Sequence, residues 1–345
     1  MEATFIIEKL VLVVIVFTIS LVIAMYSTLA ERKIAGFMQD RHGPNRAGIG
    51  GILQPLCDGG KFFFKEEIIP AGAHKTLFIL GPTLAIITAC ISSAVIPWGQ
   101  NLTIGGREIV LQVADINVGI LYVFGVVALG VYGIMLGGWA SNNKFSLMGT
   151  IRAASQSISY EIGMGLAIIA LLMVTGTLSM REIVAQQSGF VNWNIWVQPL
   201  GFLIFIVCVF AECNRVPFDL PECETELIGG YHTEYSSMKL GLYMFSEYIN
   251  MFVSSALMAA LYFGGYNFPF MNDLGLSQNW ITIIGVLVFF LKIFGFIFFF
   301  MWIRWTLPRF RYDQLLNLGW KILIPLAIAN IVLTGIVTVV KDLYF

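Results

Sequence analysis

Several ionisable side chains lie where the sequence is otherwise almost entirely apolar. Glu161, Glu247 and Lys292 each fall inside a long apolar stretch, and Glu212 ends another. An ionisable group at the centre of a bilayer costs about 2.5–3.5 kcal/mol on insertion scales, so it rarely persists without a partner or a role in moving ions. These four residues form a candidate proton pathway. The structural alternatives are hydroxyl partners for the glutamates and a lysine that extends to the interface.

A second group of carboxylates lies in residues 211–235, AECNRVPFDLPECETELIGGYHTEY, whose only Lys or Arg is Arg215. Carboxylates this close together repel one another, which favours the protonated form of some of them. Partly protonated carboxylates are useful proton carriers, so this composition favours a functional segment over an ordinary acidic surface loop. Its six acids are Glu212, Asp219, Glu222, Glu224, Glu226 and Glu234.

A third candidate is the segment 48–65, GIGGILQPLCDGGKFFFK, which has apolar residues near helical spacing. It predicts an amphipathic helix at the membrane interface. Gln54, Asp58 and Lys61 share one side of such a helix by i, i+4 and i, i+3 spacing. This polar row, followed by Phe62, could line a slot for an amphipathic ring. The alternative is a simple surface helix.

The elements that position these residues must be membrane helices. Of the 345 residues, 58% are hydrophobic and 12% are charged, and the mean hydropathy is +0.82. That is too little polar surface for a water-exposed globule, so the bilayer is the main solvent and an all-α polytopic fold is expected. The apolar runs are too long for barrel strands. Eight stretches are long enough to span a membrane, at about 8–30, 76–97, 115–138, 151–174, 196–213, 236–264, 281–303 and 321–341.

The distribution of Lys and Arg predicts the orientation of these helices. With the N-terminus outside, the inner segments hold fifteen of the 20 Lys and Arg residues and the outer segments hold four. Positive charge favours the inner side, so both termini are expected outside. The eight tryptophans fall at predicted helix ends, where an aromatic belt belongs. We predict a single membrane domain, 1–345, with inner loops 31–75, 139–150, 214–235 and 304–320.

Other classes of protein are disfavoured. The five cysteines contain no C-x-x-C pair and the three histidines lie in predicted loops, so we expect no metal, iron–sulfur or haem site. Phosphate-cradling glycine motifs are missing from the sequence. The net charge of −1 offers no basic field for nucleic acid.

Three segments together resemble one family. They are ERKIAGFMQDRHGPNRAG with LQPLCDGGKFFFKE, then AECNRVPFDLPECETELIGGYHTEYSSMKLGLYMFSEYINM, and finally RWTLPRFRYDQLLNLGWKILIP. They are similar to the signature regions of the heel subunit, called H or 1, of the proton-pumping NADH:quinone oxidoreductase, respiratory complex I. The length and eight-helix plan also match, so the resemblance covers nearly the whole chain.

The resemblance implies a subunit without a redox centre or covalently bound cofactor, with quinone as substrate and electrons supplied by an iron–sulfur partner. It implies that the chain joins the peripheral arm to antiporter-like membrane subunits. Glu161, Glu212 and Glu247 would lead from the quinone chamber towards those subunits, and we group Lys292 with them. The acidic funnel beside the chamber would contain Asp219, Glu222, Glu224 and Glu226. The quinone chamber would involve Arg32, Arg41, Gln54, Asp58, Lys61, Phe62 and Arg215.

The chain departs from the family pattern at a few small residues. Cys213 stands where Thr is common, Ser237 where Gly is common and Cys57 where Ala is common. These changes put local packing in doubt and leave the charges in place. The resemblance implies a bacterial inner membrane, with a mitochondrial inner membrane as the alternative. Two other functions stay open: the membrane subunit of an energy-converting hydrogenase and a stand-alone secondary cation transporter.

Overall fold

Apolar helices make up most of the molecule, because backbone amides in hydrocarbon are satisfied only within helices or closed sheets. The computed structural model describes residues 2–222, 224–269, 271 and 275–344, without the side chains of residues 2–4, 104, 224, 225 and 342. The long helices are α1 (Glu2–Met38), α3 (Lys75–Ser92), α4 (Gly119–Ala140), α5 (Lys144–Thr175), α10 (Ser237–Tyr262), α11 (Gln278–Thr306) and α13 (Ile324–Tyr344).

Shorter elements connect the long helices. The short α-helices are α2 (Gln54–Phe64), α6 (Met180–Gln186), α7 (Asn194–Val197), α8 (Pro199–Glu212), α9 (Glu224–Leu227) and α12 (Tyr312–Asn317). The remaining turns are η1 (Ile49–Gly51), η2 (Ser93–Val95), η3 (Gly230–His232) and the π-helical η5 (Leu318–Leu323), which joins α12 to α13.

Within the described residues, seven helices are long and apolar enough to cross a membrane. They correspond to seven of the eight predicted spans. The eighth, 196–213, is divided between α7 and α8, and α8 has only 14 residues. The break falls before Pro199, because a proline disfavours helical backbone at the preceding residue and is well suited to start a helix. At 1.5 Å per residue α8 extends about 21 Å, less than the roughly 30 Å hydrocarbon core.

Several helices extend beyond the predicted boundaries. α1 continues to Met38, and α5 begins at Lys144 within the predicted inner loop 139–150. Asn143 explains the early start of α5, since its side-chain oxygen accepts a hydrogen bond from the Phe145 amide at 2.8 Å. This is the usual contact of a helix N-cap.

One element was not predicted. Strands β1 (Asn101–Ile104) and β2 (Arg107–Val110) form an antiparallel hairpin with Ile104 paired to Arg107. The intervening Gly105 and Gly106 both have positive φ, as a two-residue hairpin turn requires. The otherwise helical fold therefore includes one small sheet.

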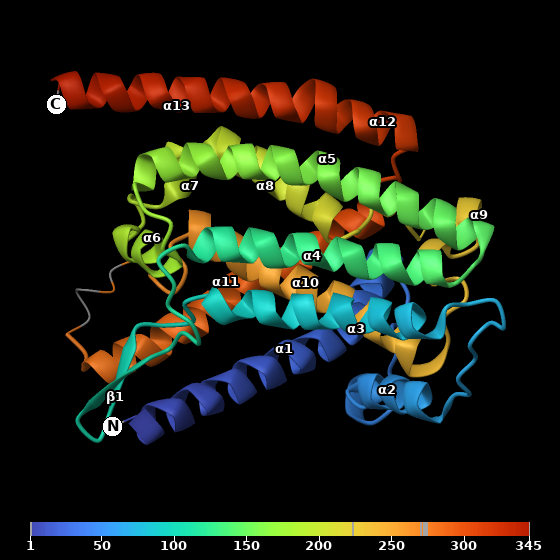
Figure 1. Ribbon diagram of the computed structural model, residues 1–345. Helices are drawn as coiled ribbons and strands as arrows, with labels where there is room; N and C mark the ends of the chain where they lie inside the picture. Colours follow the sequence, from blue (N-terminus) through green and yellow to red (C-terminus); the bar gives the residue numbers. More distant parts are fainter. Residues whose placement is uncertain (1, 223, 270, 272–274, 345) are drawn as a thin grey trace.

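The long helices lie side by side, with α1 and α13 on opposite sides of the bundle (Figure 1). The start of α1 and the end of α13 lie at one end, together with α6 and the hairpin, whereas α2, α9 and α12 lie at the other end. α10 occupies the centre and contacts α1, α2, α3 and α11. Helices α3 and α4 approach closely through Gly81 and Gly137, since a Cβ on Gly81 would lie 2.8 Å from Gly137 Cα.

Candidate functional site

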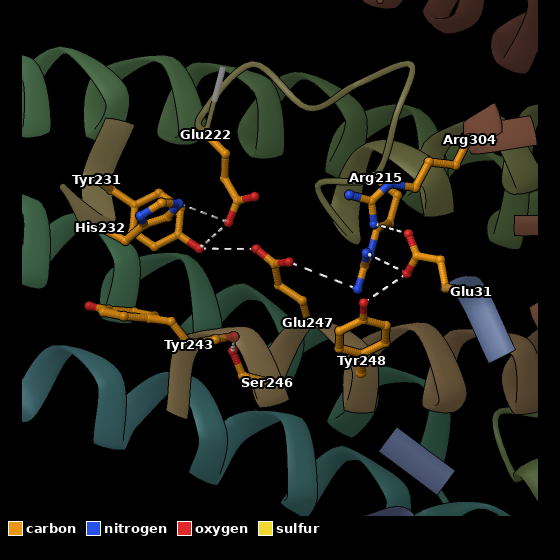
Figure 2. A network of polar contacts seen from close by, with 10 residues as sticks. All are labelled: Glu31, Arg215, Glu222, Tyr231, His232, Tyr243, Ser246, Glu247, Tyr248 and Arg304. Carbon is orange, nitrogen blue, oxygen red and sulfur yellow. Dashed lines mark hydrogen bonds and ion pairs between the residues drawn. The ribbon is translucent and has the colours of Figure 1, made fainter. Parts of the chain in front are cut away.

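A buried arginine lies between two buried carboxylates near the end of the bundle that holds α2 (Figures 1 and 2). Arg215 follows α8, Glu31 comes from α1 and Glu247 from α10. Arg215 Nη1 lies 3.5 Å from Glu31 Oε2, and Arg215 Nη2 lies 3.9 Å from Glu247 Oε2. All three residues are less than 9% exposed. One cation therefore neutralises part of the charge on two carboxylates from different helices.

Few hydrogen bonds hold this arginine. Within the described residues, Arg215 Nε and Nη2 have no hydrogen-bond acceptor. The guanidinium lies over the Tyr248 ring, 4.1 Å from the ring centre, a favourable cation–π arrangement. The Tyr248 hydroxyl donates to Glu31 Oε2 at 2.7 Å, and Arg304 forms an ion pair with the same carboxylate. Arg215 is thus held mainly by charge, and a small displacement would change its distance from both acids.

On the other side of Glu247 a tyrosine bridges two acids (Figure 2). The Tyr231 hydroxyl lies 3.0 Å from Glu247 Oε1 and 3.1 Å from Glu222 Oε1. A phenol has one hydrogen, so both contacts are hydrogen bonds at once only when one carboxyl group carries a proton. Burial and the neighbouring charges of Glu247 and Glu222 raise the pKa of Tyr231 well above its ordinary value, which keeps the bridging hydroxyl protonated.

The other acids of the 214–235 loop occupy different environments. Asp219 is buried beside Arg309, with Oδ2 3.0 Å from Nη2. Burial, together with the charge of Glu222, raises the pKa of Asp219 to about 7. Glu226 pairs with Arg152 at 2.7 Å near the surface. The side chain of Glu224 lies outside the described part of the structure. The structure therefore brings Asp219 and Glu222 close to the buried network and leaves Glu226 at its edge.

A small polar cavity connects Glu247 with Glu212. Its volume is about 30 Å³, and its polar lining includes Tyr231, Ser157 and Asn214 beside the two glutamates. A cavity of this size with several polar partners can hold a water molecule. Glu161, half-buried on α5, is close enough to Glu212 for their charges to interact. The three glutamates predicted to act together thus lie in sequence through the bundle.

Two larger cavities lie between α1, α2 and α10. One has a volume of about 300 Å³ and a partly charged lining that includes Glu31, Arg32, Asp58 and Arg304. The other has a volume of about 400 Å³ and is lined by apolar side chains and glycines. The two cavities share Phe62 among their lining residues. We call them the charged chamber and the apolar chamber.

The predicted polar row of α2 lies at the charged chamber. Asp58 Oδ1 accepts a hydrogen bond from Gln54 Nε2 at 3.1 Å, and Asp58 Oδ2 lies 2.7 Å from Arg32 Nη1. Lys61 is exposed, with its amine 5.6 Å from the Phe62 ring centre. Arg41 is exposed and donates to Gln39 at 2.8 Å. Of the predicted chamber residues, Arg41 and Lys61 do not line the charged chamber.

Lys292 lies away from the glutamates. Its amine donates hydrogen bonds to the carbonyl oxygens of Phe263, Gly265 and Asn267, at 2.7, 2.8 and 2.6 Å. It also lies 4.7 Å from the centre of the Trp193 ring. All three ammonium protons thus have acceptors in the turn that follows α10, so in this environment Lys292 caps a helix end.

Sequence reasoning missed five residues of the network. Two lie in predicted loops beside recognised acids, and the others lie far from them in the sequence, so spacing gave no signal. They are Glu31, Tyr231, Tyr248, Arg304 and Arg309.

The fold and the site together define a polytopic helical membrane protein in which buried ionisable groups connect a membrane-side chamber with the interior of the bundle. A sequence model of the family described as NADH dehydrogenase matches residues 10–335. The chain belongs to this family.

Curated relatives agree over nearly the full length. The first of two H subunits of NADH-quinone oxidoreductase named for Cytophaga hutchinsonii is 71% identical over 96% of this chain and 96% of its own length. The H subunit of Flavobacterium psychrophilum is 64% identical over 97% and 98%, and that of Flavobacterium johnsoniae is 60% identical over 99% and 98%. The expected resemblance to the heel, or H, subunit is confirmed, as is the expected class, a multi-pass subunit of NADH-quinone oxidoreductase.

Proposed function

We propose that this chain couples reduction of a quinone in its two chambers to proton transfer through Glu247, Glu212 and Glu161. The observation that carries the proposal is the position of Arg215, between a carboxylate that lines the charged chamber, Glu31, and one that lines the polar cavity, Glu247. A change of charge in the chamber can therefore alter the electrostatic environment of Glu247.

The chambers suit an amphipathic quinone. The apolar chamber would accept the ring and tail from the bilayer, and the charged chamber would receive the head group near Arg32 and Arg304. Reduction takes two electrons, supplied by an iron–sulfur partner subunit, and two protons to form the quinol. Before those protons arrive, the reduced head group carries negative charge in a partly buried cavity.

That charge would shift the ion pairs. Two unit charges 4 Å apart interact by about 4 kcal/mol at an effective dielectric constant of about 20. A negative quinone would attract Arg304 away from Glu31, and Glu31 would then draw Arg215 away from Glu247. Without its cation, Glu247 takes up a proton, and the Tyr231 hydroxyl offers a route from Glu222.

When quinol leaves, the ion pairs return and Glu247 releases its proton. The polar cavity offers the path to Glu212, and the charge interaction between Glu212 and Glu161 links the next step. From Glu161 the proton would pass to an antiporter-like partner subunit. Lys292 is not needed for this route, because its three carbonyl acceptors lie beyond the end of α10.

The same proposal fixes the orientation in a bacterial inner membrane. The inner-side excess of Lys and Arg assigns the α2 end of the bundle to the inner face. The start of α1 and the end of α13, which share the opposite end (Figure 1), would lie outside. The names of the similar proteins favour this function over a hydrogenase subunit or a stand-alone transporter.

The proposal is tested in the assembled, membrane-reconstituted enzyme with Glu247→Gln and Glu161→Gln. Both variants should keep most quinone reductase activity when the membrane is made permeable to protons, and pump fewer protons per NADH oxidised. Glu226→Gln, at the surface end of the same loop system, is the matched control. An unchanged pumping ratio in both pathway variants would contradict the proposed route.

A further inference from the structure

Two cavities of equal size and opposite character meet at Glu212. The polar cavity towards Glu247 has a volume of about 30 Å³. The second cavity has the same volume, and ten of its twelve lining residues are apolar. Its two polar lining groups are Glu212 and Ser254, whose hydroxyl accepts a hydrogen bond from Cys213 Sγ at 3.5 Å. We call this second space the dry cavity.

The dry cavity extends from Glu212 towards the end of the bundle where the chain begins and ends. Its lining includes Ile120 near the start of α4, Met180 at the start of α6 and Leu261 near the end of α10. The start of α4 and α6 lie at that end of the molecule (Figure 1). Phe205 lines the cavity seven residues before Glu212, which corresponds to about 10 Å along the helix.

The helices around this space offer no stepping stone for a proton. α8 has no charged, hydroxyl or amide side chain before Glu212, and between Ser255 and Tyr262 α10 contains only Ala, Leu and Met. A water molecule needs two to four polar partners, and apolar cavities several times larger than this one stay dry. Proton transfer needs a continuous chain of hydrogen bonds, so the chain stops at Glu212.

We propose that the dry cavity is a proton barrier: it prevents a proton on Glu212 from crossing directly to the far face of the membrane and so directs it sideways to Glu161. This inference rests on the proposed function, since it assumes that Glu212 carries protons. Its residues act by excluding water. Leu257 and Val209, both buried in the cavity wall, are its central members.

The test introduces a polar group into the barrier without a large change of volume. Leu257→Asn is compared with Leu257→Met in the complete enzyme reconstituted in liposomes. Proton uptake is measured with a pH-sensitive dye under a potassium diffusion potential, without NADH. Leu257→Asn should leak protons several-fold faster than the natural enzyme, while Leu257→Met should not. Val209→Thr, a nearly isosteric change, should also leak and provides the measurement if Leu257→Asn fails to assemble.

A double variant separates this inference from the proposed function. If Glu212 feeds the leak, Leu257→Asn/Glu212→Gln should be as tight as the natural enzyme. No leak in assembled Leu257→Asn and Val209→Thr overturns the barrier, even if Glu212→Gln alone lowers the pumping ratio. A leak that persists in the double variant also overturns it, because protons would then bypass Glu212.

Discussion

Arg215 and Glu31 come from segments 184 positions apart, yet the guanidinium lies 3.5 Å from the carboxylate and both are buried. Burying a charge is favourable only when it is paired, and removing one partner of such a pair commonly costs about 3–5 kcal/mol. Here the pair also borders the charged chamber, because Glu31 lines it. The arrangement leads to predictions about individual contacts around it.

Replacing Tyr231 with Phe should uncouple the enzyme while preserving its assembly. The ring would keep its edge contact with Tyr243 at 5.1 Å, but Glu222 and Glu247 would lose the bridging hydroxyl. A buried group that loses its hydrogen-bond partner costs about 1–3 kcal/mol, so a lower melting temperature should accompany fewer protons pumped per NADH. Tyr243→Phe is the control, because that hydroxyl donates to the Gly133 carbonyl at 3.1 Å. Equal pumping ratios in the two variants would contradict a role for the bridge.

Asp219 should make stability depend on pH. Its pKa in the folded protein is about 7, above its ordinary value of 3.8. The folded state therefore binds more protons than the unfolded state between about pH 4 and 7, so the contribution of Asp219 to stability decreases as pH rises through this interval. Asp219→Asn should flatten the corresponding part of the melting temperature curve. The same slope in the variant as in the natural enzyme would assign the dependence to another group.

Lys292→Met should weaken the structure without changing the coupling ratio. Hydrogen bonds to a charged group contribute about 1.5–3 kcal/mol each, and this change removes three. We expect a lower yield of assembled enzyme and a lower melting temperature, with reductase and pumping activities falling in proportion. Normal assembly combined with selective loss of pumping would instead return Lys292 to the proton pathway.

Asp58→Asn should affect quinone use more than stability. The Arg32–Asp58 pair is partly exposed, with side-chain exposures of 50% and 22%, and pairs of this kind contribute about 0–1 kcal/mol. Because Asp58 lines the charged chamber, the variant should show a higher KM for a short-chain quinone and an unchanged melting temperature. Asp115→Asn breaks a comparable pair with Arg181 at 3.3 Å, outside the chambers. The proposal for Asp58 fails if the two variants have the same KM.

Hydropathy alone predicted the long helices, because roughly twenty consecutive apolar residues leave few alternatives in a bilayer. It did not reveal the break before Pro199, where backbone geometry outweighs hydrophobicity. The β1–β2 hairpin was also missed, although its two glycines between β-forming residues are a recognisable signal.

The site was predictable only in part, for a related reason. Glu161, Glu212 and Glu247 stood out because each interrupts an apolar run. Glu31 did not, since it sits beside Arg32 and Lys33 and looked like the start of a loop. Its partners Tyr248 and Arg304 are 217 and 273 positions away, and such distant contacts leave no local pattern.

The close approach of α3 and α4 has a mechanical consequence. With Gly81 against Gly137 there is no room for these helices to slide past each other. The loop that carries Arg215 is tied elsewhere, through the Pro217 carbonyl to the Phe310 amide at 3.1 Å. When that loop shifts, the stiff helix pair stays in place and the displacement passes to the segment leading into α13, at the edge of the subunit.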